Sequence, residues 1–117
     1  MHLTPDILAA TWDFLRSLPP FARWKLPEAD AVEFHVVRVS HFADHTTYRG
    51  PEPLRHIVRV SEDRVEHATT LVKTMAHEMI HAAQAAANTA TRAEHNADFH
   101  RRALLVGRTL GFDPKEL

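Results

Sequence analysis

The residues with the clearest chemical potential lie in the second half of the chain, where residues 77–81 read HEMIH and fit the pattern HExxH. On an α-helix, His77 and His81 would lie one turn apart on the same face, so both imidazoles could reach one metal ion. Glu78 would lie about 100° around the helix axis from His77, beside the ion rather than bound to it. A carboxylate placed there can take a proton from a water that zinc has activated. The spacing therefore predicts a catalytic zinc site with Glu78 as the general base.

A catalytic zinc site takes three protein ligands and leaves one position open, so a third ligand must come from elsewhere. The sequence after the motif offers four candidates: Glu94, His95, Asp98 and His100. The stretch TRAE has the form of a capping box, which predicts a helix from Thr91 to Leu110 with Glu94 committed to its cap. The apolar residues of this helix form one stripe: Phe99, Ala103, Val106 and Leu110. His95 lies one turn upstream in the same stripe and is predicted as the third ligand. Asp98 is then an outer acid, a possible acceptor for a ligand imidazole, and His100 a flank residue.

Helical periodicity also supports the placement of the motif itself. Thr70 is a suitable cap for a helix over residues 71–87. The apolar side chains of this helix recur on the side away from the two histidines: Val72, Met75, Ala76, Met79, Ala83 and Ala86. His77 and His81 are therefore expected to face a cleft or another element. Together with His95, they would hold one zinc ion per chain.

The first half of the chain predicts one helix and three strands. Thr4-Pro5-Asp6 is typical of a helix start, and Pro19-Pro20 ends that helix. Its expected apolar face is formed by seven residues: Ile7, Ala10, Thr11, Phe14 and Leu18, widened by Trp12 and Leu15. Strands are predicted at 31–40, 46–49 and 56–61, and the polar neighbours of the last suggest an edge strand. The expected fold class is α+β, with an N-terminal helix, a small three-stranded sheet and two packed helices that carry the zinc site.

The composition narrows the classes of protein. A chain of 117 residues and 13.3 kDa has room for one domain, expected over residues 1–117. A net charge of −1 removes the plain electrostatic argument for binding nucleic acid or a membrane surface. The absence of cysteine excludes disulfides, thiolate zinc sites and a cysteine nucleophile. No apolar run approaches the roughly 20 residues of a membrane span and no signal-like segment follows Met1, so a cytoplasmic protein without a membrane partner is expected.

Histidine is the one overused residue, with 10 in the chain. Outside the candidate site, no pair combines ligand spacing with helical support. No functional role is therefore expected for the histidines on or beside the strands: His35, His41, His45, His56 and His67.

These segments together resemble the SprT-like (Spartan-type) zinc metallopeptidase domain, an HExxH zincin. The resemblance spans about Leu3 to Phe112, and its most specific piece is LVKTMAHEMIHA. Further matching pieces are FLRSLP, IVRVSED and HNADFH, the last after 13 residues that follow the motif. The family's third histidine comes at that distance with an aromatic residue four positions on, as His95 and Phe99 do. Glycines that normally flank this histidine are replaced by Glu94 and Asn96. Without cysteine, the C-terminal zinc ribbon of many members is not expected.

The resemblance implies hydrolysis of peptide bonds in a protein or peptide substrate. Zinc would lower the pKa of a water from about 16 to about 7, and Glu78 would move its proton. Tyr48 is a candidate second group for stabilising the oxyanion, and strand 56–61 a candidate edge for pairing with an extended substrate. Two alternatives remain, a non-catalytic zinc-binding adaptor domain and a nucleic-acid accessory protein. The latter is suggested by the family but not supported by the charge, and it would use four arginines: Arg55, Arg59, Arg101 and Arg102.

Overall fold

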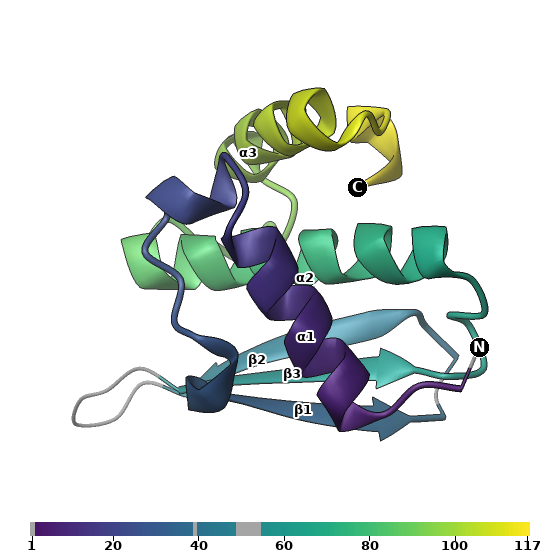
Figure 1. Cartoon of the computed structure of the whole chain (residues 1–117). Coiled ribbons are helices and arrows are strands. Elements are labelled where there is room, and N and C mark those ends of the chain that lie inside the picture. Colours follow the sequence, from purple (N-terminus) through teal and green to yellow (C-terminus); the bar gives the residue numbers. More distant parts are fainter. Residues whose placement is uncertain (1, 39, 49–54) are drawn as a thin grey trace.

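The computed structural model describes residues 2–38, 40–48 and 55–117, without the side chain of Tyr48. Three α-helices, three strands and three short 3-10 turns follow one another along the chain (Figure 1): α1 Pro5–Arg16, η1 Phe21–Arg23, η2 Ala29–Ala31, β1 Val32–Val37, β2 Ala43–Tyr48, β3 Arg55–Ser61, α2 Ala68–Ala87, α3 Ala97–Leu110 and η3 Pro114–Glu116. The predicted α+β class is confirmed, with a helix, a three-stranded sheet and two packed helices in that order.

The sheet has the strand order β1-β3-β2, with β3 parallel to β1 and antiparallel to β2. Strand 56–61 was expected at an edge and is instead the central strand. It pairs with β1 on one side and β2 on the other, and its inward residues Val58 and Val60 are fully buried in the core. The expected substrate edge along 56–61 is therefore wrong, since the edges of this sheet are β1 and β2.

The two faces of the sheet differ sharply. The inner face packs against α1 and α2, with α2 lying between the sheet and α3 (Figure 1). The outer face is charged: Arg59 donates to the Asp44 carboxylate at 2.9 Å, and Arg55 pairs with Glu33. This alternation explains why β1 and β3 read as polar-apolar repeats in the sequence.

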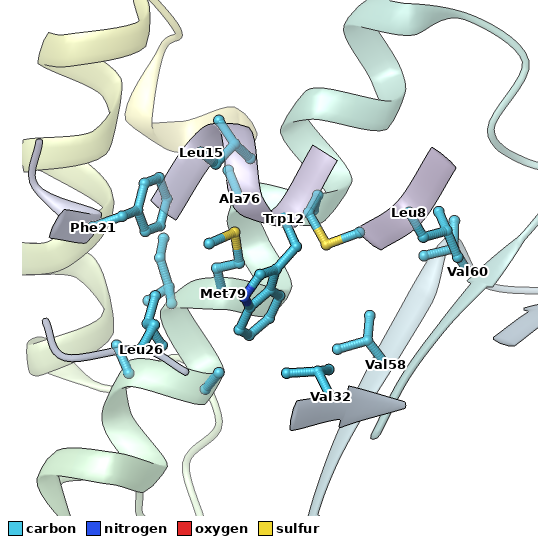
Figure 2. Close-up of a cluster of buried hydrophobic side chains, with 14 of the residues drawn as sticks. Leu8, Trp12, Leu15, Phe21, Leu26, Val32, Val58, Val60, Ala76 and Met79 are labelled. Atoms are coloured by element: carbon cyan, nitrogen blue, oxygen red, sulfur yellow. The ribbon is translucent and has the colours of Figure 1, made fainter. Parts of the chain in front are cut away.

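Helix α1 begins as predicted, but of its expected apolar face Trp12 and Leu15 are buried and Ile7 and Phe14 are not. The Thr4 hydroxyl accepts a hydrogen bond from the Ile7 backbone N–H at 3.2 Å and caps the helix. Ile7 and Phe14, expected in the core, are 37% and 58% exposed. The buried residues are Leu8, Trp12 and Leu15, and Figure 2 shows Trp12 in the middle of the core.

Trp12 decides this orientation of α1. Its indole N–H donates to the Pro27 carbonyl at 2.9 Å, and its ring meets Phe34 of β1 edge-on, with centroids 5.7 Å apart. An indole satisfies its N–H and buries its large apolar surface only in this rotation of the helix. Phe14, two positions further on, then faces outward.

Helix α2 is buried on most of its sides because it is packed between two layers. It begins at Ala68, after His67, so the expected cap at Thr70 is wrong and Thr70 lies within the first turn. The predicted apolar stripe is too narrow: Leu71, Ile80 and Ala82 are also buried, whereas Ala86 is exposed. Within the described part of the chain, no helix is both long and apolar enough to cross a membrane.

Helix α3 starts five residues later than predicted, since its cap is Asn96 and not Thr91. The Asn96 side chain caps it by accepting from the Phe99 backbone N–H at 2.9 Å. The expected capping box of Thr91 and Glu94 does not form a helix start, and residues 91–96 are a loop. The helix ends at Leu110 as predicted, followed by Gly111 in the left-handed region with φ 78°. His95 therefore lies in the loop before the helix, not in its apolar stripe.

Candidate metal centre

The structure brings the rings of His77, His81 and His95 together. One ring nitrogen of each lies within 4.8 Å of the others, and the described residues hold no other such group of metal-binding side chains. His77 Nε2 lies 3.2 Å from His81 Nε2 and 3.3 Å from His95 Nε2. Tetrahedral zinc with Zn–N bonds of about 2.0–2.1 Å separates its ligand nitrogens by about 3.3–3.4 Å. The donor set, and the spacing of His77 from each of the other two nitrogens, therefore fit zinc.

The two histidines of α2 are held in the neutral form that a metal requires. Burial, followed by the neighbouring imidazoles, lowers the pKa of His77 to about 4, and burial also lowers the pKa of His81 to about 4. The backbone of Leu117 acts to raise the pKa of His77 but is outweighed by burial and by the neighbouring imidazoles.

His95 reaches the site from the loop before α3. Its ring packs on Phe99, with centroids 4.6 Å apart, and Phe99 also contacts the rings of His77 at 5.1 Å and His81 at 4.9 Å. Phe99 is 1% exposed and forms the apolar floor under all three imidazoles. The predicted residue is thus at the site, although the predicted helix that was to place it there is not.

Asp98 anchors this loop instead of contacting an imidazole, as had been considered. Its carboxylate accepts hydrogen bonds from Thr89 at 2.7 Å and from Gln84 at 3.1 Å, and Gln84 also donates to Asn96 at 2.9 Å. The loop on either side of His95 is therefore tied to α2 and to the start of α3. Sequence analysis missed this network because its members come from three separate segments.

The same carboxylate neutralises a buried cation. Arg102 donates to Asp98 at 2.9 Å, its side chain is 8% exposed, and its guanidinium lies 4.9 Å from the Trp24 ring centroid. Burial acts to raise the pKa of Asp98, but the hydrogen bonds from Arg102, Thr89, Arg101 and Gln84 outweigh it and hold that pKa below its usual range. Asp98 stays ionised beside Arg102.

Replacing Asp98 by alanine is expected to lower the free energy of unfolding by about 3 kcal/mol, because Arg102 would remain buried without its carboxylate. Chemical denaturation of the metal-free protein measures this. A matched control is Glu62→Ala, which breaks the pair with the 75% exposed Arg38 and should cost less than about 1 kcal/mol. Equal losses in the two variants would contradict the role assigned to Asp98.

Glu78 is buried beside the three imidazoles. It is 5% exposed, and burial, then the carboxylates of Asp44 and Glu94, raises its pKa to about 8. Two hollows of about 490 and 580 Å³ meet at His77 and Glu78, within the size range of ligand pockets. The first extends toward Phe42, Arg64 and Lys73, and the second toward His81, His95 and β2. Glu78 thus lies at the middle of an open cleft.

The buried neutral histidines predict a pH dependence of stability. Burial and its neighbours lower the pKa of His45 to about 3, while His77 and His81 titrate near pH 4. In the unfolded chain these rings titrate near pH 6.5, so below that pH the unfolded state binds more protons. The free energy of unfolding of the metal-free protein should therefore be highest near pH 6.5 and fall progressively toward about pH 4. Glu78, with its pKa raised to about 8, acts in the opposite direction, offsets part of this loss and lowers the free energy of unfolding above pH 6.5.

Urea unfolding at about pH 7.5 and about pH 5 tests this, with chelator present throughout. His81→Gln should reduce the loss between the two pH values. His35→Gln, on the exposed outer face of β1, should leave it unchanged. The same free energy at both pH values would contradict the expectation.

The remaining sequence candidates are less central. Glu94 lines the second hollow, and His100 is exposed on α3 outside both. Tyr48 ends β2, but its side chain lies outside the described residues. Sequence analysis missed His45, which also lines the second hollow. Its signal was the alternation of Ala43, His45 and Thr47 on one face of a strand.

Comparison with known proteins adds one match. The family model described as SprT-like family matches residues 22–116, which include the sheet, α2, the His95 loop and α3. The match leaves out α1. Neither the search of curated proteins nor the search of solved structures gave a match.

Proposed function

This chain belongs to the SprT-like family, and on that premise we propose that it is a zinc metalloendopeptidase in which His77, His81 and His95 hold zinc and Glu78 is the general base. One observation carries the proposal: three imidazole nitrogens within 4.8 Å of one another share an open cleft with a buried glutamate. A structural zinc site is usually closed by a fourth ligand and needs no base. Among the described residues no fourth ligand joins the three histidines, which favours catalysis over the adaptor alternative.

Zinc bound at this site would supply a Lewis acid that polarises a carbonyl and makes a water acidic enough to lose a proton near neutral pH. Glu78 accepts that proton as the water attacks and passes it to the leaving nitrogen. In the metal-free protein burial keeps Glu78 largely protonated near neutral pH, and the positive charge of bound zinc would lower its pKa and favour the carboxylate that a general base requires. The ring of Phe99, which contacts all three imidazoles, keeps them in place during the reaction.

The substrate is proposed to lie along β2. This strand pairs with β3 on one side only and is an edge of the sheet. Its residues Ala43, His45 and Thr47 line the hollow that contains the three histidines. An extended peptide can pair with the free backbone groups of such a strand, which places its carbonyls in the cleft with little dependence on side chains.

The four arginines that a nucleic-acid accessory role would use are paired with carboxylates of the protein itself. Arg55 pairs with Glu33, Arg59 with Asp44, and Arg101 and Arg102 both pair with Asp98. Phosphate contacts would have to compete with these carboxylates. This arrangement supports the peptidase over a nucleic-acid accessory role.

The proposal is tested by removing zinc and restoring it. Purified protein is stripped with a chelator, and cleavage of a fluorescently labelled unfolded protein is followed before and after one equivalent of zinc is added. Hydrolysis that is lost on chelation and returns with zinc is expected. One bound zinc per chain without any hydrolysis would overturn the peptidase proposal and favour the adaptor.

A further inference from the structure

A second pair of histidines lies in the wall of the same cleft. His45 Nε2 lies 2.8 Å from His56 Nδ1, and the two ring centroids are 5.1 Å apart. The Thr47 hydroxyl lies 3.3 Å from the same nitrogen of His45. His56 is 2% exposed, in the core between the sheet and α2. The mechanism above uses neither ring.

The strand register places the pair toward the metal centre. In the β2–β3 ladder, His45 is opposite Val58 and Thr47 is opposite His56. Since Val58 is fully buried, this is the inner face of the sheet, against which α2 packs. His45 lines the hollow that also contains Glu78, His81 and His95. It therefore lies on the β2 side of the cleft, where a substrate paired with β2 would pass.

Both imidazoles of the pair are neutral, and solvent cannot take the place of either one in the hydrogen bond between them. Burial lowers the pKa of both rings, and His56 adds to the effect on His45. Each neutral imidazole carries one N–H, so one of the two must donate across the 2.8 Å contact. The nitrogens of one imidazole point in nearly opposite directions. With Nε2 of His45 engaged by the buried His56, Nδ1 is the nitrogen left to meet a group in the hollow that His45 lines.

We propose that His45 is a further catalytic residue, which donates Nδ1–H to the carbonyl oxygen of the scissile peptide, and that His56 positions it by donating Nδ1–H to His45 Nε2. The inference rests on the peptidase proposal. His45 keeps its proton throughout and stabilises the negative charge that develops on the oxygen. Burying two imidazoles stabilises the fold less than burying two apolar side chains at the same positions would. The pair is therefore consistent with a role other than stability. Sequence analysis offered Tyr48 for this role, and its side chain lies outside the described residues.

The tautomer of His45 distinguishes the proposed role from a purely structural one. In water the Nε2–H form of histidine predominates, whereas the proposal requires Nδ1–H. Ring ¹⁵N chemical shifts of the wild-type protein identify the protonated nitrogen at neutral pH. We expect His45 with a protonated Nδ1, and a change toward Nε2–H in His56→Phe. Protonated Nε2 at His45 in the wild type would overturn the proposal without any measurement of activity.

Kinetics separate the two roles. His45→Phe should lower kcat by about 100-fold or more with KM changed only a few-fold and zinc still at one per chain. His56→Phe should lower kcat less, and His56→Asn, which can place an amide N–H where Nδ1 stands, should restore most of it. The control His35→Phe replaces a strand histidine on the outer face of the sheet. Wild-type levels of kcat in His45→Phe would overturn this inference alone, whereas no hydrolysis by the wild type would overturn the peptidase proposal with it.

His45→Asn guards against a variant that fails to fold. Its shorter amide can still donate from the position of Nδ1, so it should retain more of kcat than His45→Phe. Equal losses of kcat in two folded, zinc-loaded variants would contradict donation by His45.

Discussion

Glu78→Gln is expected to reduce peptide hydrolysis by about 10²- to 10⁴-fold, because glutamine keeps the size of the side chain but cannot accept a proton. Zinc content should stay at the wild-type level, since none of the three imidazoles is changed. The free energy of unfolding should not fall. The carboxyl it replaces is buried, with a pKa raised to about 8, and a neutral amide is no harder to desolvate.

Hydrolysis rates, zinc content and denaturation of the same preparations check this expectation. Asp63→Asn is a suitable control, because it removes an exposed carboxylate in the turn after β3. Retention of hydrolysis in Glu78→Gln at the wild-type rate would exclude Glu78 as the base. Loss of hydrolysis together with loss of zinc would instead make Glu78 part of metal binding.

His95→Ala is expected to weaken zinc binding by more than about 100-fold, because it leaves two of the three nitrogen ligands. The comparison with His100→Ala is informative, since both are exposed histidines of the same segment. His100 is directed away from the cluster and meets Phe99 only edge-on, at 6.0 Å between ring centroids. Zinc content after dialysis at a fixed free zinc concentration should fall in the first variant only.

The two variants also test whether His95 or His100 is the third zinc ligand. Loss of zinc in His100→Ala with retention in His95→Ala would contradict the ligand set proposed here. Both substitutions are at exposed side chains, and the core contacts that they remove are ring contacts with Phe99, at 4.6 Å for His95 and 6.0 Å for His100. Their free energies of unfolding in chelator should therefore stay close to that of the wild type.

Local patterns were sufficient to predict the parts of the site that lie on one element. The spacing of His77 and His81 needs only the geometry of a helix, and the apolar residues of α2 recur with that period. The end of α3 was readable for the same reason, because Gly111 and its neighbours are a local signal. These features depend on residues within one or two turns of each other.

The start of α3 was not readable, because two capping signals compete. Thr91 with Glu94 and Asn96 with its own first turn are both plausible from sequence. Asn96 is selected by Gln84, which reaches it from α2 and also binds Asp98. A contact between helices thus decides a boundary that local propensity leaves open.

Strand order and the second histidine pair were out of reach for a related reason. Whether strand 56–61 is central depends on its pairing with β1, across more than 20 residues. His45 and His56 meet only through the register of β2 on β3. In α1, Trp12 is buried and Phe14 is exposed because Trp12 contacts Pro27 and Phe34, which lie outside the helix.

The most direct test of the account is to look for new peptide termini. An unfolded protein is incubated with zinc-loaded wild type and with zinc-loaded Glu78→Gln, and the products are sequenced by mass spectrometry. The account predicts internal cleavage sites with the wild type and none above background with the variant, at equal zinc content. No new termini from a wild type that holds one zinc per chain, or the same termini from both proteins, would contradict it.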